Sequence, residues 1–380
     1  MAGGRTFVGA LALVTLTTLA PEPAGAATTW TIQASPNRGT VSNWLGDVSC
    51  PTASRCVAVG AHRNDALPTA PPYGTLIETY AQGKWSVTAS PGQNRINALW
   101  GVSCPTVNRR YAVGTSIATN HALIATFSGG AWSSMPTPDL GDASGLSGIS
   151  CVDASHCFAV GWAGSVDTEH TLVLALSSGT WSVMPSPNRG ASGNLLQSVS
   201  CSTAASCVAV GIRLNGSIAR TLAIRLSGGI WTLMATPNRT TKPNWLKAVS
   251  CATSTQCTAV GSYVNQADIH RTLIETWSGG VWSAVPSPNR GAAENGLEDV
   301  SCVDATHCIA VGGGNHRTVI ESLAGGAWSI VPSPNQDPWP GSLTGVDCLS
   351  LSVCVAVGES SAFTPTSFAS RTLVLRSRPT

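Results

Sequence analysis

The chain has 380 residues, of which 43% are hydrophobic and 11% are charged, so it can bury a large core and lacks the composition of a disordered protein. The formal net charge is +2, and lysine occurs only at Lys84, Lys242 and Lys247. Because no basic tract is dense enough to neutralise a run of phosphates, the composition argues against nucleic acid as a partner.

Residues 1–26 predict a secretory signal peptide. Arg5 precedes an apolar run, and Ala24 and Ala26 form an A-x-A cleavage site before Ala27. The run of about 14 residues is shorter than the ~18 that a membrane helix needs, and no later segment reaches that length. A retained anchor is the alternative. We expect a secreted, extracellular and monomeric mature chain with no transmembrane segment, in a compartment where thiols oxidise.

A tryptophan-led segment, "WTIQASPN" at residues 30–37, opens the mature chain and recurs at intervals of 46 to 55 residues. Each interval contains four short segments rich in Val, Ile, Leu, Thr and Trp and bounded by Gly, Pro, Asn or Ser, which predicts four β-strands. Runs such as "VAV" are apolar without alternation, as expected for strands covered on both faces. The leading tryptophans are Trp30, Trp85, Trp132, Trp181, Trp231, Trp282 and Trp328.

Seven units of four strands predict an all-β fold, a seven-bladed β-propeller with antiparallel blades. A β-helix would need shorter repeats, and a row of sandwiches would need about seven strands per domain. The last unit ends at residues 371–377 without a fourth strand, whereas residues 30–37 form a fourth strand with no blade before it. We therefore expect the N-terminal strand to complete the last blade and close the ring, in one domain over residues 27–380.

These repeats resemble known families. The "GGxW" hairpin before each tryptophan-led strand is similar to that of Kelch and Asp-box (BNR) repeats, and the unit "LxxVSCxxxxxCxAVG" resembles uncharacterised secreted bacterial repeat proteins. The resemblance covers residues 30–380 and implies a propeller. The segments "SGGVW" (278–282) and "SGGAW" (128–132) have no aspartate where the Asp-box pattern S-x-D-x-G-x-x-W has one.

Thirteen cysteines follow one pattern, in which two cysteines with five residues between them flank the turn between the first and second strands. Facing positions across a hairpin are compatible with a disulfide, and a secreted chain favours one. Zinc is the rival, because His156 and His307 stand beside cysteines. Cys104 has Arg110 at its partner position, which predicts a buried free thiol. The predicted disulfides are Cys50–Cys56, Cys151–Cys157, Cys201–Cys207, Cys251–Cys257, Cys302–Cys308 and Cys348–Cys354.

The connections from the fourth strand to the next blade and from the second strand to the third are long and variable, and in a propeller they share one face. In the fourth unit they are residues 191–195 and 212–220. We call this the long-loop face. Variable loops on a rigid scaffold usually carry function, so the candidate site residues were sought there.

Cations form two sets on this face. Both could hold carboxylate, sulfate or phosphate groups by charge-assisted hydrogen bonds. The alternative is a repeated structural task, such as capping carbonyls at strand ends or stacking on the blade tryptophan. The first set is Arg38, Arg189, Arg239 and Arg290, and the second is His121, His170, Arg220, Arg271, Arg317 and Arg371.

Four further tryptophans, Trp44, Trp162, Trp245 and Trp339, occupy the same loops outside the repeat's own tryptophan position. Their flat faces, with Asn and Arg nearby, are suited to stacking against sugar rings. The alternative is that they cover the rim of the core.

Acidic residues gather on the innermost strands of three consecutive blades, at Asp47, Glu298, Asp299 and Asp347. Oxygen ligands that converge on the central channel would suit Ca²⁺. Separate acids solvated in a wet channel are the alternative, and no other cofactor is predicted.

An enzyme would need stricter geometry. A glycosidase needs two carboxylates that flank the bond, and the loop acids Asp65, Asp139, Asp142, Asp167, Glu169, Asp268, Glu294 and Asp337 lie in different loops. No G-x-S-x-G, HExxH or phosphate-loop motif occurs. The sequence favours a binding or scaffold protein that recognises a glycan or a protein surface through the long-loop face. A carbohydrate-active enzyme, a hydrolase or lyase acting at the channel mouth, is the alternative, and a purely structural envelope protein is a third.

Overall fold

The computed structural model describes Met1 and residues 28–39, 41–63, 73–91, 97–165, 168–191, 193–336, 340–364 and 367–379. The predicted signal peptide lies, apart from Met1, outside the described residues. In the part of the chain that is described, no helix is long and apolar enough to span a bilayer.

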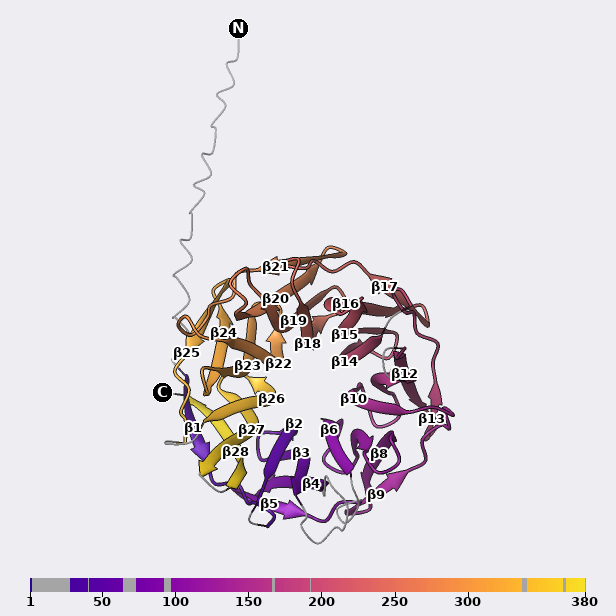
Figure 1. Ribbon diagram of the computed structural model, residues 1–380, viewed down its shortest axis with the longest axis vertical. Helices are drawn as coiled ribbons and strands as arrows, with labels where there is room; N and C mark the ends of the chain where they lie inside the picture. The colour runs from indigo at the N-terminus through magenta and orange to yellow at the C-terminus, as the bar shows by residue number, and fades with distance from the viewer. Residues whose placement is uncertain are drawn as a thin grey trace.

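The described residues form 28 strands in seven four-stranded antiparallel sheets, and Figure 1 shows these sheets as the blades of a ring. Blades 1 and 2 contain β2 (Asn43–Thr52), β3 (Arg55–Arg63), β4 (Tyr73–Ala81), β5 (Lys84–Thr88), β6 (Asn97–Ser103), β7 (Arg110–Ser116), β8 (His121–Ser128) and β9 (Ala131–Met135). Blades 3 and 4 contain β10 (Ser144–Cys151), β11 (Cys157–Ala163), β12 (His170–Ser177), β13 (Thr180–Val183), β14 (Asn194–Thr203), β15 (Ser206–Asn215), β16 (Ile218–Ser227) and β17 (Ile230–Met234). Blades 5 and 6 contain β18 (Asn244–Thr253), β19 (Gln256–Val264), β20 (His270–Ser278), β21 (Val281–Val285), β22 (Asn295–Asp304), β23 (His307–Gly314), β24 (Arg317–Ala324) and β25 (Ala327–Val331). Blade 7 contains β26 (Gly341–Ser350), β27 (Val353–Thr364), β28 (Ser367–Pro379) and β1 (Thr28–Gln33). The predicted fold class is confirmed.

The ring closes as the sequence predicts. Strand β1 pairs antiparallel with β28, with Trp30 opposite Ser377, and so supplies the fourth strand of blade 7. Figure 1 shows β1 (indigo) beside β28 (yellow), at the outer edge of that blade. Strand β26 in turn packs against β2 of blade 1, so the first and last blades adjoin.

The described residues form seven apolar core clusters, each shared between neighbouring blades. In β3 the side chains alternate between two such clusters: Val57 and Val59 pack toward blade 2, whereas Ala58 packs toward blade 7. All three side chains are almost fully buried, and a buried valine stabilises the fold by roughly 1.5–3 kcal/mol. This two-sided burial explains why the "VAV" strands are apolar on both faces.

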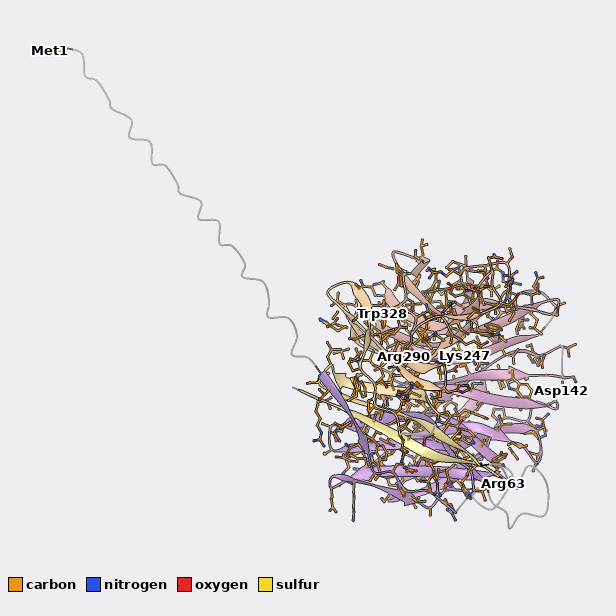
Figure 2. The ribbon with its side chains drawn as sticks, turned by 60° about the vertical axis from the view of Figure 1, so that its left-hand side comes forward. Met1, Arg63, Asp142, Lys247, Arg290 and Trp328 are labelled. Carbon is orange, nitrogen blue, oxygen red and sulfur yellow. A yellow bond between two sulfur atoms is a disulfide. The ribbon has the colours of Figure 1, made fainter. Side chains whose placement is uncertain are left out.

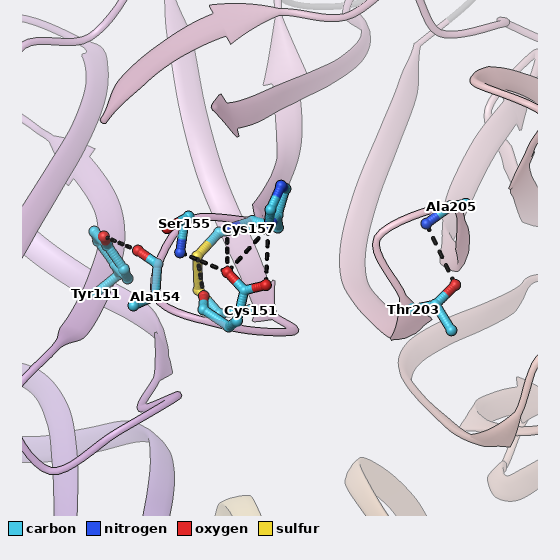
Figure 3. A network of polar contacts seen from close by, with 9 residues as sticks. Tyr111, Cys151, Ala154, Ser155, Cys157, Thr203 and Ala205 are labelled. Carbon is cyan, nitrogen blue, oxygen red and sulfur yellow. Dashed lines mark hydrogen bonds and ion pairs between the residues drawn. A yellow bond between two sulfur atoms is a disulfide. The ribbon is translucent and has the colours of Figure 1, made fainter. Parts of the chain in front are cut away.

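All six predicted disulfides are present, with Cα–Cα distances of 4.0–4.1 Å. In blade 3, Cys151 stands directly opposite Cys157 in the ladder (Figure 3). Because the sulfurs bond each other, the zinc alternative is wrong for these cysteines. His156 instead contacts Asp153 of its own hairpin, with 2.8 Å between Nδ1 and Oδ2, and His307 contacts Asp304 in the same way.

The serine of the "VSC" motif joins each blade to the next. In six blades its Oγ accepts a hydrogen bond from the backbone N–H of the first cysteine position of the following blade, at 2.9–3.1 Å. For example, Ser150 Oγ accepts from Cys201 N. Each such bond satisfies an N–H on an innermost strand that has no further strand to pair with. The six serines are Ser49, Ser103, Ser150, Ser200, Ser250 and Ser301.

Blade 2 replaces the disulfide with a cation. Cys104 is a buried free cysteine, as predicted, and burial raises the pKa of its thiol to about 12. Arg110 is 5% exposed, donates from Nε and Nη2 to Val107 O at 3.1 and 2.7 Å, and lies 4.3 Å from the centre of the Phe127 ring. By these hydrogen bonds to Val107 O, the guanidinium group stabilises the hairpin that a disulfide stabilises in the other blades.

Replacing Arg110 by cysteine should complete the set of disulfides. Ser103 stands opposite Tyr111, so the register places position 110 opposite Cys104. We expect Arg110→Cys to reduce the free thiols measured in denaturant from one per chain to none. Closing this loop contributes about 2 kcal/mol, so the melting temperature should exceed that of the Arg110→Ala control. Two titratable thiols in the cysteine variant would contradict this.

Three glutamates are fully buried in the third strands of their blades. Ser35 Oγ donates to Glu78 at 2.8 Å and Ser287 Oγ donates to Glu321 at 3.1 Å, whereas neither carboxyl oxygen of Glu275 has a hydrogen-bond partner among the described residues. Burial raises the pKa of Glu78 to about 7 and that of Glu275 and Glu321 to about 8. In the unfolded chain a glutamate has a pKa near 4.5 and loses its proton above that pH. Between about pH 4.5 and pH 8 the folded protein therefore binds more protons than the unfolded chain does.

This proton balance predicts that the free energy of unfolding falls as pH rises from about 4.5 to about 8. Leu174 and Leu375 occupy the position of Glu275 in blades 3 and 7 and are fully buried. We expect Glu275→Leu to flatten the decline and to be most stabilising, relative to wild type, above pH 8. Urea unfolding at pH 5 and pH 8.5 measures this, with the exposed Glu294→Leu as the control. An unchanged slope in Glu275→Leu would contradict the assignment.

Candidate functional site

A cavity of about 550 Å³ lies on the ring axis and is lined by residues from all seven blades. It reaches the long-loop face, since Trp44 stands at the start of β2 and Trp162 near the end of β11. In the side view of Figure 2, Arg63 and Asp142, two residues of that face, lie on the right-hand side of the ring. We call this space the channel cavity and define it by Trp44, Trp100, Trp162, Gln197, Lys247 and Glu298.

A β-bulge in each innermost strand builds the cavity wall. The ladder register skips one residue of every "LxxVSC" segment, and the skipped residue lines the cavity. The facing "AVG" glycine makes room for the bulge, since a Cβ on Gly60 would collide with the carbonyl oxygen of Trp44. The bulged residues are Gly46, Trp100, Ser147, Gln197, Lys247, Glu298 and Thr344.

Trp100 is the most exposed aromatic side chain of the cavity. Its ring stacks on that of Trp44, with centroids 4.7 Å apart and planes at 26°, yet 44% of the residue remains exposed. One face of the indole is therefore held by Trp44 while the other is open to the channel. Trp100 was not among the sequence-predicted residues, which were sought in loops; the signal was its place as the first x of "LxxVSC".

Of the other predicted tryptophans, one lines the cavity and one does not. Trp162 lines the cavity. Its indole ring packs against Gly145 of β10, where an added Cβ would stand 2.8 Å from Trp162 Nε1. Trp245 is not part of the cavity lining and stacks on His270, with centroids 5.2 Å apart and planes at 13°. Trp339 lies outside the described residues. The structure thus brings Trp44 and Trp162 together, and adds Trp100.

The "PNR" segments connect blades. The backbone N–H of Arg290 donates to Asn295 Oδ1 at 2.9 Å, and equivalent bonds occur at 2.7–2.9 Å from Arg38, Arg189 and Arg239 to Asn43, Asn194 and Asn244. The guanidinium groups of Arg290 and Arg239 donate to the carbonyls of Thr318 and Val285. Their side chains thus bind backbone carbonyls, while that of Arg189 is exposed.

In the second set of cations, Arg220 and Arg271 each donate to three carbonyls of the next loop at 2.7–3.2 Å. These contacts match the alternative in which the repeated arginines cap carbonyls. Arg220 and Arg271 therefore hold in place the loops that follow Arg239 and Arg290.

The channel acids join neighbouring blades. Asp47 accepts hydrogen bonds from Val48 N and Val102 N, at 2.7 and 2.8 Å, one on each carboxylate oxygen, and Asp299 accepts from Val300 N and Val346 N in the same way. Asp347, which stands where other blades have the "VSC" serine, accepts from Cys50 N at 2.6 Å. These three carboxylates are bonded to protein, so the alternative of separate solvated acids does not describe them.

Burial is the main cause of the pKa shifts of these acids. It raises the pKa of Asp47 to about 7 and that of Asp347 to about 6, and it raises the pKa of Asp299 well above 3.8 with help from the nearby charge of Asp47. Backbone N–H donors oppose the shift without cancelling it. Among the described residues, no group of three or more His, Cys, Asp or Glu side chains is placed to hold a metal ion.

Glu298 differs from the other three acids. It lies 3.6 Å from Lys247, measured from Oε2 to Nζ, and the two side chains are 39% and 38% exposed. Both occupy bulge positions in adjacent blades, so both face the channel cavity. They form the charged part of its wall.

Comparison with known proteins supports the fold only. No protein-family model matches the chain, and no curated protein matches it. The chain is similar to a solved structure of YCF48 bound to D1 peptide, with 12% identity over 94% of this chain and 99% of that one and a TM-score of 0.58. A neuraminidase-like protein of subtype N11 from A/flat-faced bat/Peru/033/2010 (H18N11) matches at 12% identity, over 94% and 96% of the two chains, with a TM-score of 0.46. The resemblance to Kelch and BNR repeats stays a prediction.

A calcium titration tests the channel acids. Each oxygen of Asp47 and of Asp299 already accepts a backbone N–H bond, and burial favours the uncharged form of both acids by raising their pKa, so they bind a cation less readily than exposed carboxylates would. We expect millimolar CaCl₂ and EDTA to leave the melting temperature unchanged. A rise with CaCl₂ that Asp299→Asn abolishes would show that these carboxylates bind the ion.

Proposed function

We propose that this protein is a secreted binding or scaffold protein that recognises a glycan or a protein surface through its long-loop face, with the channel cavity as the central site. The observation that supports this most is the composition of the cavity. Its volume of about 550 Å³ is in the usual range of ligand pockets, and indole rings share its wall with amide and charged groups. Six disulfides fit an extracellular protein.

The predicted residues outside the cavity form the rim of the proposed surface. Arg38, Arg189, Arg239 and Arg290 belong to the long loops around it, Trp245 stands at the start of β18 beside those loops, and Trp339 is proposed for the same role from its sequence position. A protein ligand belongs to the proposal because the similar structure of YCF48 was determined bound to D1 peptide.

The enzymatic alternative, a glycoside hydrolase or lyase at the channel mouth, has less support. Glycoside hydrolysis needs one carboxyl group that gives a proton and a second that acts as base or nucleophile. Asp47 and Asp299 each accept backbone N–H bonds from two blades, so both already join blades, and Glu298 has Lys247 rather than a second carboxyl group 3.6 Å away.

Glycan-array binding followed by a hydrolase screen on the hits tests this proposal. We expect Trp44→Ala and Trp162→Ala to weaken binding at least about tenfold, because each removes an aromatic wall of the cavity, and we expect no turnover. Trp245→Ala tests the proposed rim and should weaken binding less than either cavity variant, since Trp245 holds the repeat position of Trp44 but is not part of the cavity lining. Melting curves confirm that each variant is folded.

Two results would contradict the proposal. If Trp245→Ala abolished binding while Trp44→Ala and Trp162→Ala did not, the ligand would lie outside the channel cavity. Turnover of a bound glycan, abolished by a single substitution such as Glu298→Gln, would establish the enzymatic alternative.

A further inference from the structure

The channel cavity has two unlike walls. Blades 1 to 3 contribute Trp44, Trp100, Ile117 and Trp162, whereas blades 4 to 6 contribute Gln197, Lys247 and Glu298. Strand β6, which contains Trp100, lies across the ring axis from β18 and β22, which contain Lys247 and Glu298 (Figure 1). A ligand that fills the cavity therefore meets a flat apolar surface on one side and hydrogen-bonding groups on the other.

Two rings of the aromatic wall are stacked on each other without a ligand. Stacking on Trp44 holds one face of Trp100, and the open face carries the negative side of the indole quadrupole. C–H bonds that point out of the plane of a sugar ring are weakly positive and suit such a face. Since the indole is already ordered, binding loses little side-chain entropy there.

The charged pair suits hydroxyl groups. At 3.6 Å and more than a third exposed, the contact between Lys247 and Glu298 is too long for a hydrogen bond and contributes little to stability. Lys247 keeps its ammonium donors and Glu298 keeps its acceptor oxygens. One hydroxyl can accept from Lys247 while its neighbour donates to Glu298, and the pair has no net charge to favour an ion.

A peptide strand is a poorer fit to the wall of the channel. Adding a strand requires free N–H groups on the innermost strands. In blade 1 the N–H groups of Val48 and Cys50 already donate to Asp47 and Asp347, and in blade 2 those of Val102 and Cys104 donate to Asp47 and Ser49. The other blades bond the equivalent cysteine N–H in the same way.

We infer that the channel cavity binds an uncharged oligosaccharide, with a sugar ring stacked on Trp100 and neighbouring hydroxyl groups hydrogen-bonded to Lys247 and Glu298. This inference rests on the proposed binding function and narrows its ligand class. It assigns to Trp100, Lys247 and Glu298 direct contact with the sugar.

Calorimetry with matched sugars tests it. The probes are N-acetylated chito-oligosaccharides and their cationic de-N-acetylated counterparts at pH 6, methyl-esterified oligogalacturonates and their anionic free acids, and neutral glucan, mannan and galactan oligosaccharides. We expect wild type to bind a neutral probe, and to bind it more tightly than any charged counterpart in the set. Failure to bind any neutral probe would overturn the inference.

The variants identify the ligand's charge. For a neutral sugar, Trp100→Ala, Lys247→Ala and Glu298→Ala should each weaken binding at least about tenfold, because each removes a stacking face or a hydrogen bond to a charged group. Glu298→Gln keeps an acceptor oxygen and should weaken it less. The exposed Lys84→Ala, on the outer strand β5, is the control and should change nothing.

Opposite responses would overturn the inference. Tighter binding by Glu298→Ala with loss in Lys247→Ala indicates an anionic ligand, and the reverse pattern indicates a cation. If Trp44→Ala weakened the binding of such a charged sugar, the proposed binding function would stand, and only the inference that the ligand is uncharged would be wrong. A wild-type protein that bound no sugar but bound a protein partner through the long-loop face would likewise overturn this inference alone. If it bound neither, the proposed function itself would fail.

Discussion

The β-bulge in each innermost strand is the constraint on which the rest of the structure depends. It requires a glycine in the facing strand, because the carbonyl oxygen before the bulge occupies the space of a Cβ at Gly60 and its equivalents. It leaves one residue per blade unpaired and directed to the channel. Beyond the bulge, side chains and N–H groups of adjacent innermost strands meet, as in the contact from Asp47 to Val102. One local distortion thus shapes both the cavity and the joints between blades.

Those contacts between blades explain where the three half-buried aspartates of the innermost strands lie. Most blades need only a serine hydroxyl to accept the next blade's cysteine N–H. Around the closing blade, Asp299, Asp347 and Asp47 link blades 6 to 7, 7 to 1 and 1 to 2. Blade 7 combines β1 with β26, β27 and β28, which lie far from β1 in the sequence. The contacts from blades 6 and 1 to this blade therefore support the sheet that closes the ring. Charge-assisted hydrogen bonds are roughly twice as strong as neutral ones, and burial of the carboxylates offsets part of that gain.

The architecture could be predicted from the sequence because the same pattern of strands and turns occurs in seven repeat units. The spacing of the tryptophans predicted seven blades, and the unmatched strand at Trp30 predicted how the ring closes. The cysteine pairs on either side of a hairpin turn predicted the disulfides. The site was harder, because channel residues come from different repeats and their meeting depends on ring geometry. Trp100 faces the channel because of the β-bulge, which the alternation of side chains along a strand does not predict, and the Lys247–Glu298 contact joins two repeats whose shared position holds no common residue.

That lack of a common residue is itself informative. In "LxxVSC", the leucine is buried, the serine or its aspartate replacement joins blades, and the cysteine forms a disulfide across a hairpin in six of the seven blades, so these positions repeat their chemistry. The bulge position has seven different residues in seven blades, from Gly46 to Trp100 to Lys247, although every one occupies the same place in its strand. A position with no shared packing task is free to vary blade by blade. When all seven such positions face one cavity, their differences make its walls unlike one another, which a ligand with an apolar face and a polar edge can use.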